Sequence, residues 1–213
     1  MNNIEKNKKV YDYCADKYYS EYFNVWEGES FDVEFLNKLT GKKAFLDLGC
    51  GNGNLAHFAM QKGFKVKGYD LSEKRIAIGK KYNPKLDIHV MDITNIPKEK
   101  EKFDGAIYSY SLMHLTKAQA KQSLLSLNKN LKMGAVLCIL TCKGKGFKYI
   151  ACEDFDKSDK MFFTFYTEES ITKLLNSCGY EVQNIKLKYD DSQDANVSSE
   201  DLVVFATKVK EKN

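Results

Sequence analysis

The segment FLDLGCGNGN, residues 45–54, constrains this chain more than any other, because it places three glycines within five positions directly after an apolar run. The glycines are Gly49, Gly51 and Gly53, and the run carries an acid at Asp47. A strand, a glycine turn and a helix in succession let a ligand lie against bare backbone, with the helix amides pointing at it. The segment predicts a ligand site, although a purely structural strand-to-helix turn has the same pattern.

The next strand ends in a second acid, Asp70 of VKGYD, about twenty residues after the first glycines. An acid at the tip of the second strand is placed to accept both hydroxyls of a ribose. The ligand is therefore expected to contain a nucleoside.

The glycine spacing separates two nucleoside classes. Dinucleotide sites use G-x-G-x-x-G, whereas this chain has G-x-G-x-G with Asn54 in the next position. Asp47 would face a pyrophosphate poorly but an ammonium group well. In VMDITNIP, Asp92 can accept from the exocyclic amine of adenine, with Ile93 beside it as apolar cover. Taken alone, Asp92 is equally typical of an acid that opens a loop.

Helical and strand patterns alternate along the whole chain, which predicts an α/β fold with a largely parallel sheet covered by helices on both faces. The last two strands follow each other without a helix, so one edge of the sheet should be mixed. Strands are expected at 44–48, 65–69, 88–91, 103–109, 135–141, 181–189 and 202–209, and helices at 8–23, 31–39, 54–62, 72–82, 116–131 and 167–178.

Several residues are expected to mark the ends of these helices. Thr116 and Gln119 form the pattern of a capping box that opens the helix over 116–131, and Gly134 is expected to end it. Gly41 and Gly179 are expected to close two further helices.

At this point the residues resemble the class I S-adenosylmethionine-dependent methyltransferases, in their small-molecule branch with a type 11/25-like domain. The resemblance rests on LDLGCGNG, GYDLS, MDITNIP, FDGAIYSYSLMHL, LKMGAVLCI and FFTFYTEESITKLLNSCGYEV. It implies a Rossmann-like, doubly wound sheet of seven strands with the last strand inserted antiparallel. It also implies S-adenosyl-L-methionine as the cofactor.

The resemblance assigns cofactor-binding roles to ten residues. Asp47 and the backbone of Gly49 and Gly51 would face the methionine part of the cofactor, and the Tyr108 backbone would contact its amino group. Asp70 would bind the ribose, Leu71 would contact the adenine face, and Asp92 with Ile93 would contact the adenine edge. Tyr11 and Tyr18 lie in a YDxxAxxY-like segment that would fold over the cofactor.

The acceptor side is less marked in the sequence. His114 follows the fourth strand of the cofactor-binding core and is the candidate general base, although a packing residue that opens the next helix fits equally well. Trp26 and Tyr166 are candidate substrate-binding residues, and Tyr166 fits a core aromatic as well. We predict methyl transfer to oxygen or nitrogen of a small molecule.

The chain is expected to form one methyltransferase domain over 1–213, with a helical lid over 1–40, the cofactor-binding core over 41–142, and a substrate-side loop, last helix and terminal hairpin over 143–213. The net charge of +4 is scattered, and no N/D-P-P-aromatic turn follows the fourth strand, so a nucleic-acid acceptor is not expected. Lys143, Lys145 and Lys148 form the densest basic cluster and could contact an anion.

Other classes of protein have little support in the sequence. The six cysteines and three histidines show no metal-ligand spacing, so no metal is expected. The longest apolar stretch is too short to span a membrane, and the first twenty residues are not a signal peptide, so a cytoplasmic monomer or homodimer is expected. Two alternatives remain open: a catalytically silent S-adenosylmethionine-binding partner subunit and a nicotinamide-dependent oxidoreductase.

Overall fold

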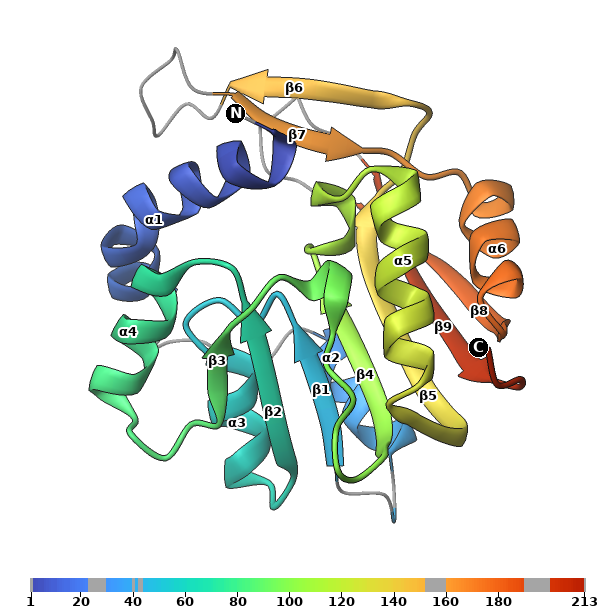
Figure 1. Cartoon of the computed structure of the whole chain (residues 1–213), viewed down its shortest axis with the longest axis horizontal. Helices are drawn as coiled ribbons and strands as arrows, with labels where there is room; N and C mark the ends of the chain where they lie inside the picture. The colour runs from blue at the N-terminus through green and yellow to red at the C-terminus, as the bar shows by residue number, and fades with distance from the viewer. Residues whose placement is uncertain are drawn as a thin grey trace.

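Seven strands form one sheet in the order β3-β2-β1-β4-β5-β9-β8 (Figure 1). The computed structural model describes residues 2–22, 30–39, 41, 44–151, 160–189 and 200–212, without the side chains of 17–22 and 30. The strands β1 to β5 are parallel, and β9 is antiparallel to both β5 and β8, which confirms the predicted fold class. Their bounds are β1 Ala44–Leu48, β2 Lys65–Asp70, β3 Ile88–Val90, β4 Phe103–Ser109, β5 Leu131–Cys142, β8 Tyr180–Tyr189 and β9 Glu200–Lys208.

Helices cover both faces of the sheet because its buried strands carry apolar residues on both sides. Phe45 and Ile107 face α2 (Ser30–Lys38), α3 (Asn54–Gln61) and α4 (Glu73–Tyr82). Leu46 and Ala106 face α5 (Lys117–Asn128) and α6 (Glu168–Ser177). This alternation places Asp47, between Leu46 and Leu48, on the same face as Phe45.

The predicted capping box is confirmed: the Thr116 side chain accepts from the backbone of Gln119, and the Gln119 side chain accepts from the backbone of Thr116. The prediction that Gly134 ends this helix is wrong. The helix α5 ends at Asn128, and β5 begins at Leu131, which pairs with Phe103 of β4. Gly134 lies inside β5 with a φ of 74°, where the register between β4 and β5 shifts, so its positive φ serves a bulge rather than a helix end.

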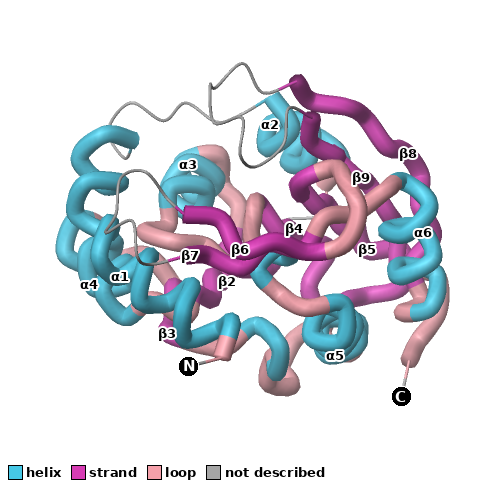
Figure 2. The backbone as a smooth tube through the Cα atoms, turned by 90° about the horizontal axis from the view of Figure 1, so that it is seen from above, coloured by secondary structure: helices cyan, strands magenta, loops and turns pink. Residues whose placement is uncertain are grey.

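A pair of antiparallel strands occupies much of the substrate-side loop expected from residue 143 onward. Its strands are β6 (Phe147–Ala151) and β7 (Lys160–Thr164), which pair antiparallel. Together with α1 (Asn3–Tyr22) the hairpin lies over the carboxyl ends of the parallel strands (Figures 1 and 2). Asn7 of α1 secures it, because its side chain accepts from the Phe162 amide at 2.8 Å and donates to the Phe162 carbonyl at 3.1 Å.

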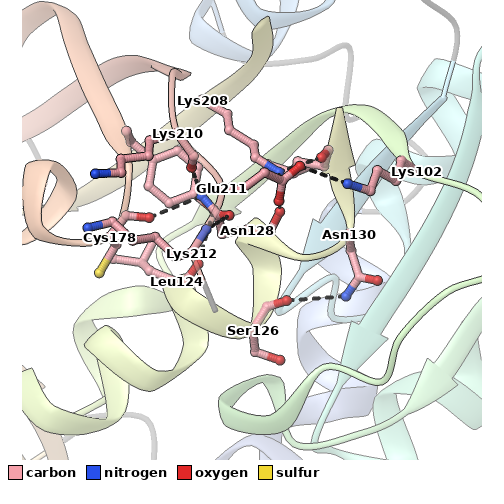
Figure 3. A network of polar contacts seen from close by, with 12 residues as sticks. Lys102, Leu124, Ser126, Asn128, Asn130, Cys178, Lys208, Lys210, Glu211 and Lys212 are labelled. Carbon is pink, nitrogen blue, oxygen red and sulfur yellow. Dashed lines mark hydrogen bonds and ion pairs between the residues drawn. The ribbon is translucent and has the colours of Figure 1, made fainter. Parts of the chain in front are cut away.

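The C-terminal segment is fastened to the end of α5 by buried polar contacts (Figure 3). The ammonium of Lys208, fully buried, donates to the carbonyls of Asn128 and Leu131 at 2.6 and 2.8 Å and pairs with Glu211 at 3.0 Å. The Asn128 amide donates to the carbonyls of Cys178 and Lys210. These contacts hold the inserted strand β9 in register. None of the helices in the described residues has the length and apolar composition needed to cross a bilayer.

Candidate functional site

The ends of β1 and β2 are joined by hydrogen bonds at the glycine turn. The amides of Gly49 and Cys50 donate to the Tyr69 carbonyl at 2.7 and 3.0 Å. The carboxylate of Asp70 accepts from the Gly51 amide and from the Ser72 amide, each at 2.8 Å. Asp70 therefore holds the turn after β1 and the start of α4 in one place.

Two positions of the turn require glycine for two reasons: the backbone there has a positive φ, and side chains from other segments pack directly against it. Gly49 has a φ of 83°, and a Cβ there would lie 2.3 Å from the Cβ of Ser111. Gly51 has a φ of 57°, and a Cβ there would lie 2.9 Å from the guanidinium carbon of Arg75. Because these glycines have no side chains, residues from the segment after β4 and from α4 can pack against the backbone of the turn.

Two adjoining cavities lie at the carboxyl ends of the strands. The larger, of about 200 Å³, is called here the glycine-turn pocket, and the smaller, of about 80 Å³, the η1 pocket after the 3-10 helix η1 (Ile93–Asn95) beside it. The two pockets share Tyr11, Gly49, Asp70, Ser111 and His114. Their shared wall makes one site with two compartments.

Most of the residues proposed from the sequence for the cofactor meet at this site. Asp47 and Gly51 line the glycine-turn pocket only. Leu71, Asp92 and Ile93 line the η1 pocket only, and Asp92 opens η1 by accepting from the Thr94 amide at 2.8 Å. Gly49, Asp70, Tyr11 and His114 line both. The individual roles assigned to these residues stay predictions.

Two of the proposed residues lie elsewhere. Tyr108 is buried within β4 with its hydroxyl 2.7 Å from the Ser123 hydroxyl, and it lines neither pocket. The pocket is lined instead by Ser109, Tyr110 and Ser111 at the end of that strand. Tyr166 is 1% exposed in the core that faces α5 and α6, and its hydroxyl finds no hydrogen-bond partner among the described residues. Trp26, the side chain of Tyr18 and the loop 190–199 lie outside the described residues.

Asp47 is an acid held in an environment that opposes its ionisation. Its side chain is 3% exposed and lines the glycine-turn pocket. Burial, and then the negative charges of Asp32 and Asp70, raises the pKa of Asp47 to about 8. A cationic group entering the pocket would favour the ionised form, so Asp47 is poised to respond to the charge of a ligand.

His114 joins the site to the hairpin above it. It ends the 3-10 helix η2 (Leu112–His114), and its Nδ1 lies 3.0 Å from the Phe162 carbonyl of β7, while its Nε2 lies 2.6 Å from the Tyr11 hydroxyl. Because a carbonyl only accepts, Nδ1 carries the proton, and Nε2 accepts from Tyr11. Burial, partly offset by the bond to Phe162 and reinforced by the charge of Arg75, lowers the pKa of His114 to about 4.

Sequence reasoning missed several residues that line the site, above all Arg75 and Tyr110. Arg75 is 8% exposed on α4, and its side chain reaches back to the glycine turn. Its place one turn into the helix that follows Asp70 is the signal that could have indicated it. Tyr110 has a φ of 53°, a conformation that disfavours side chains, and no sequence pattern indicates it.

The chemistry of the donor set suits a cationic nucleoside. The pockets present carboxylates from the ends of three neighbouring strands, Asp47, Asp70 and Asp92, beside the apolar Leu71 and Ile93. Within the described residues, no group of three or more His, Cys, Asp or Glu side chains is arranged to hold a metal ion.

One protein-family model matches the cofactor-binding core of this chain. Residues 45–134 match the model of a methyltransferase domain. The match covers less than half of the chain. The predicted resemblance to class I S-adenosylmethionine-dependent methyltransferases is confirmed by this match and by the fold shared with solved members of that class.

Solved methyltransferases share the fold of this chain. An S-adenosylmethionine-dependent methyltransferase from Methanosarcina mazei superposes with a TM-score of 0.73 and 19% identity, over 84% of this chain and 98% of that one. The 1,6-didemethyltoxoflavin-N1-methyltransferase of Burkholderia thailandensis, solved with bound 1,6-didemethyltoxoflavin and S-adenosylhomocysteine, superposes with a TM-score of 0.68 and 16% identity, over 99% of this chain and 92% of that one.

Curated relatives match over part of their length. An uncharacterized methyltransferase of Alkaliphilus oremlandii is 29% identical over 129 residues, 60% of this chain and 58% of the relative. The tRNA (carboxymethyluridine(34)-5-O)-methyltransferase of Saccharomyces cerevisiae is 28% identical over 106 residues, 50% of this chain and 36% of the relative. The chain thus spans less than two thirds of the length of either protein.

The low pKa of His114 predicts a specific dependence of stability on pH. A histidine whose pKa falls from 6.5 to about 4 on folding contributes stability above pH 6.5 that is lost as the pH falls toward 4, about 3 kcal/mol in all. His114→Asn keeps a donor for Phe162 and does not titrate. Urea unfolding from pH 7 to 4 should show wild type losing stability relative to this variant. Parallel curves for the two proteins would refute the assignment of His114 as a buried neutral side chain.

Proposed function

We propose that this chain binds S-adenosyl-L-methionine across the two pockets and transfers its methyl group to oxygen or nitrogen of a small molecule. The observation that carries the proposal is the meeting of Asp47, Asp70 and Asp92 at the carboxyl ends of β1, β2 and β3, around two joined cavities. A ligand with a nucleoside and a positively charged end satisfies all three acids.

The residues of the chain would divide the cofactor between the pockets. Asp70 lines both, and besides the two amides it already binds, its carboxylate has acceptor capacity for ribose hydroxyls. Asp92 and Leu71 would hold the adenine in the η1 pocket, and Asp47 would meet the ammonium of the methionine end in the glycine-turn pocket. This assignment uses each acid for a group of matching charge or donor character.

The cofactor supplies an activated methyl group, so the chain mainly has to align the acceptor and exclude water. The lid formed by α1 and the hairpin β6–β7 would do both, since Asn7 and His114 fasten β7 above the pockets. His114 is our candidate proton acceptor through the Tyr11 hydroxyl at 2.6 Å. Its pKa of about 4 makes it a weak base, which suits an acceptor that gives up its proton readily.

A small acceptor is supported by the position of the pockets beside α1, whose Tyr11 lines both, and by the likeness in fold to a small-molecule N-methyltransferase over nearly the full length of the chain. A second class, a nucleotide in RNA, is favoured by one surface. Phe147 and Tyr149 of β6 are 64% and 45% exposed, and the ammonium of Lys6 lies 4.8 Å from the centroid of the Tyr149 ring. Exposed aromatic rings beside lysines are typical of surfaces on which unpaired bases stack.

Replacing Asp70 tests the cofactor assignment. Asp70→Asn keeps one carbonyl oxygen and should weaken binding of S-adenosylhomocysteine, measured by isothermal titration, by about 1–3 kcal/mol through weaker hydrogen bonds to the ribose. Asp87→Asn, at the opposite end of the sheet before β3, is the matched control and should bind like wild type. If a reduced nicotinamide nucleotide bound saturably and with higher affinity than S-adenosylhomocysteine, the proposal would be refuted. Cofactor binding without transfer to any acceptor would favour a silent subunit instead.

The raised pKa of Asp47 predicts that cofactor binding releases a proton. Below a pH of about 8 the carboxyl is mostly protonated in the free protein, and an ammonium group beside it favours ionisation. Affinity for S-adenosylhomocysteine should therefore rise between pH 6 and 8, with a binding heat that depends on the ionisation heat of the buffer. Asp47→Asn should abolish the part of this dependence that Asp47 causes. An unchanged buffer dependence in the variant would exclude Asp47 as the source.

The two acceptor classes are separated by RNA binding. If RNA is the acceptor, a labelled stem-loop with an unpaired loop should bind in fluorescence anisotropy at low salt, and Phe147→Ser with Tyr149→Ser should weaken it about tenfold or more. Tyr82→Ser is the control, because Tyr82 is 54% exposed with Lys81 beside it, on α4 away from the hairpin. No binding by wild type would leave the small molecule as the acceptor.

A further inference from the structure

An open groove lies between α5 and the segment that joins β3 to β4, two parts of the chain that lie side by side in Figure 1. Its volume of about 690 Å³ exceeds that of either pocket of the candidate site. Ile96 and Leu125 give it an apolar floor. The hydroxyls of Ser123 and Ser126 on α5 donate to the carbonyls of Ile93 and Ile96 at 2.6 and 2.8 Å. These bonds fix the segment against the helix, so the groove has a defined shape.

Three lysines give this groove charge of one sign. The groove, called here the lysine groove, is lined by Lys98, Lys121 and Lys129, and none of the described residues that line it is acidic. The three ammonium groups have no ion pair within the described part of the chain, whereas those of Lys67 and Lys132 pair with carboxylates at 2.7 and 2.8 Å. Unpaired charges of one sign that line one groove favour a partner of the opposite sign.

The three lysines are spread along the groove. Lys121 lies in α5, and Lys129 follows the last turn of α5 in helical conformation, so the two are about 12 Å apart along the helix axis. Lys98 lies on the opposite wall, in the segment after η1. A single small anion matches charges spread in this way poorly, whereas a chain with repeated negative charges can contact each of them. The arrangement favours a polyanion.

The lysine groove adjoins the candidate site through η1. Ile93 lines the η1 pocket, and the next two residues, Thr94 and Asn95, line the groove. A polymer that lies in the groove therefore passes beside the two pockets, where one of its units can enter.

The first turns of α1 link the lysine groove to exposed aromatic rings. The Asn3 amide donates to the Gln119 side chain of α5 at 3.0 Å, and the ammonium of Lys6 lies 4.8 Å from the centroid of the Tyr149 ring. Tyr149 and Phe147 of β6 are 45% and 64% exposed. Bases stack on such rings while lysines hold phosphates, whereas an acidic protein segment needs only the lysines. The two surfaces together favour a nucleic acid.

We propose that the lysine groove binds the phosphate backbone of an RNA strand and presents one of its unpaired nucleotides to the two pockets. This inference rests on the second acceptor class of the proposed function. The three lysines position the strand without reading its sequence, and the rings of Phe147 and Tyr149 stack on bases beyond the start of α1.

Removing the three charges together tests the proposal. The variant Lys98→Gln, Lys121→Gln, Lys129→Gln is compared with wild type by fluorescence anisotropy of a labelled stem-loop RNA with an unpaired loop, between about 50 and 200 mM salt. The variant should bind about tenfold or more weakly at the lowest salt. The slope of log affinity against log salt should become shallower by about 2, because each phosphate contact with a single strand contributes about 0.7.

A second triple variant controls for the loss of net charge. Lys80→Gln, Lys81→Gln, Lys85→Gln removes three exposed lysines at and after the end of α4, which covers the opposite face of the sheet. This variant should keep the salt slope of wild type. Equal losses in the two triple variants would reduce the effect to general attraction by positive charge and would overturn the proposal, as would absence of RNA binding by wild type.

Competition separates RNA from an acidic protein segment as the occupant. Unlabelled RNA should displace the labelled stem-loop at lower concentrations of negative charge than polyglutamate does, because polyglutamate offers nothing to the aromatic rings. Equal displacement by the two polymers would overturn RNA as the occupant and assign the groove to an acidic protein.

Cofactor binding separates failure of this inference from failure of the proposed function. The three lysines line neither pocket, so their triple variant should bind S-adenosylhomocysteine like wild type in isothermal titration, and melting curves establish that it is folded. Wild type that binds S-adenosylhomocysteine but no RNA would overturn this inference alone. Wild type that binds RNA through the groove but no S-adenosylhomocysteine would overturn the proposed methyl transfer and leave the groove as an RNA-binding surface.

Discussion

The carboxylate of Asp70 is the interaction on which the site depends. One of its oxygens accepts from Gly51 in the turn after β1, and the other accepts from Ser72, the N-cap of α4. A side chain at the end of one strand thus fixes the backbone of its neighbour and the start of the next helix. Because a carboxylate has acceptor capacity beyond these two bonds, the same group can also face a ligand. Structural and binding roles are therefore inseparable at this position.

In the lid, as at Asp70, one side chain makes both structural contacts and contacts at the site. The strand β7 leaves one edge unpaired by β6, and such edges must be satisfied or covered. Here Asn7 from α1 and His114 from η2 supply the missing partners at Phe162, from segments far apart in the chain. Since His114 also binds the hydroxyl of Tyr11, the wall of the pockets and the anchoring of the lid share one imidazole. A change in the lid must then alter the acceptor side of the site.

Charge in the glycine-turn pocket is balanced rather than uniform. Asp47 is buried beside other acids, whereas Arg75 approaches from α4 across the bare backbone of Gly51. Opposite charges on separate walls of the pocket favour a ligand that carries a positive and a negative group. They disfavour a ligand that carries charge of one sign only. This balance distinguishes the pocket from the mostly apolar η1 pocket, where Leu71, Met91 and Ile93 offer flat cover to a base. The two compartments thus have the characters expected of the two ends of the proposed cofactor.

The sequence by itself determined the parallel sheet, most of its strands and the grouping of the cofactor residues. The bounds of β1 and β4 follow from apolar runs between turn residues, and Thr116 with Gln119 opens α5 by a bond between neighbours. Gly49, Asp70 and Asp92 could be grouped because carboxyl ends of parallel strands always meet at one edge. All of these signals act within a few residues or through a known topology.

Only the tertiary structure decided which side chains meet across that edge. Glycine is typical of helix ends, but Gly134 lies in a β-bulge, because pairing of Leu131 with β4 outweighs the local preference. The hairpin β6–β7 was missed because its stability comes from packing on α1 and η2 rather than from its own turn. Arg75 with Asn52, and Tyr11 with His114, come from segments separated in the chain, and nothing in their local sequence encodes the contact. Periodicity and turn chemistry are short-range, whereas these contacts depend on the order of strands and the packing of the lid.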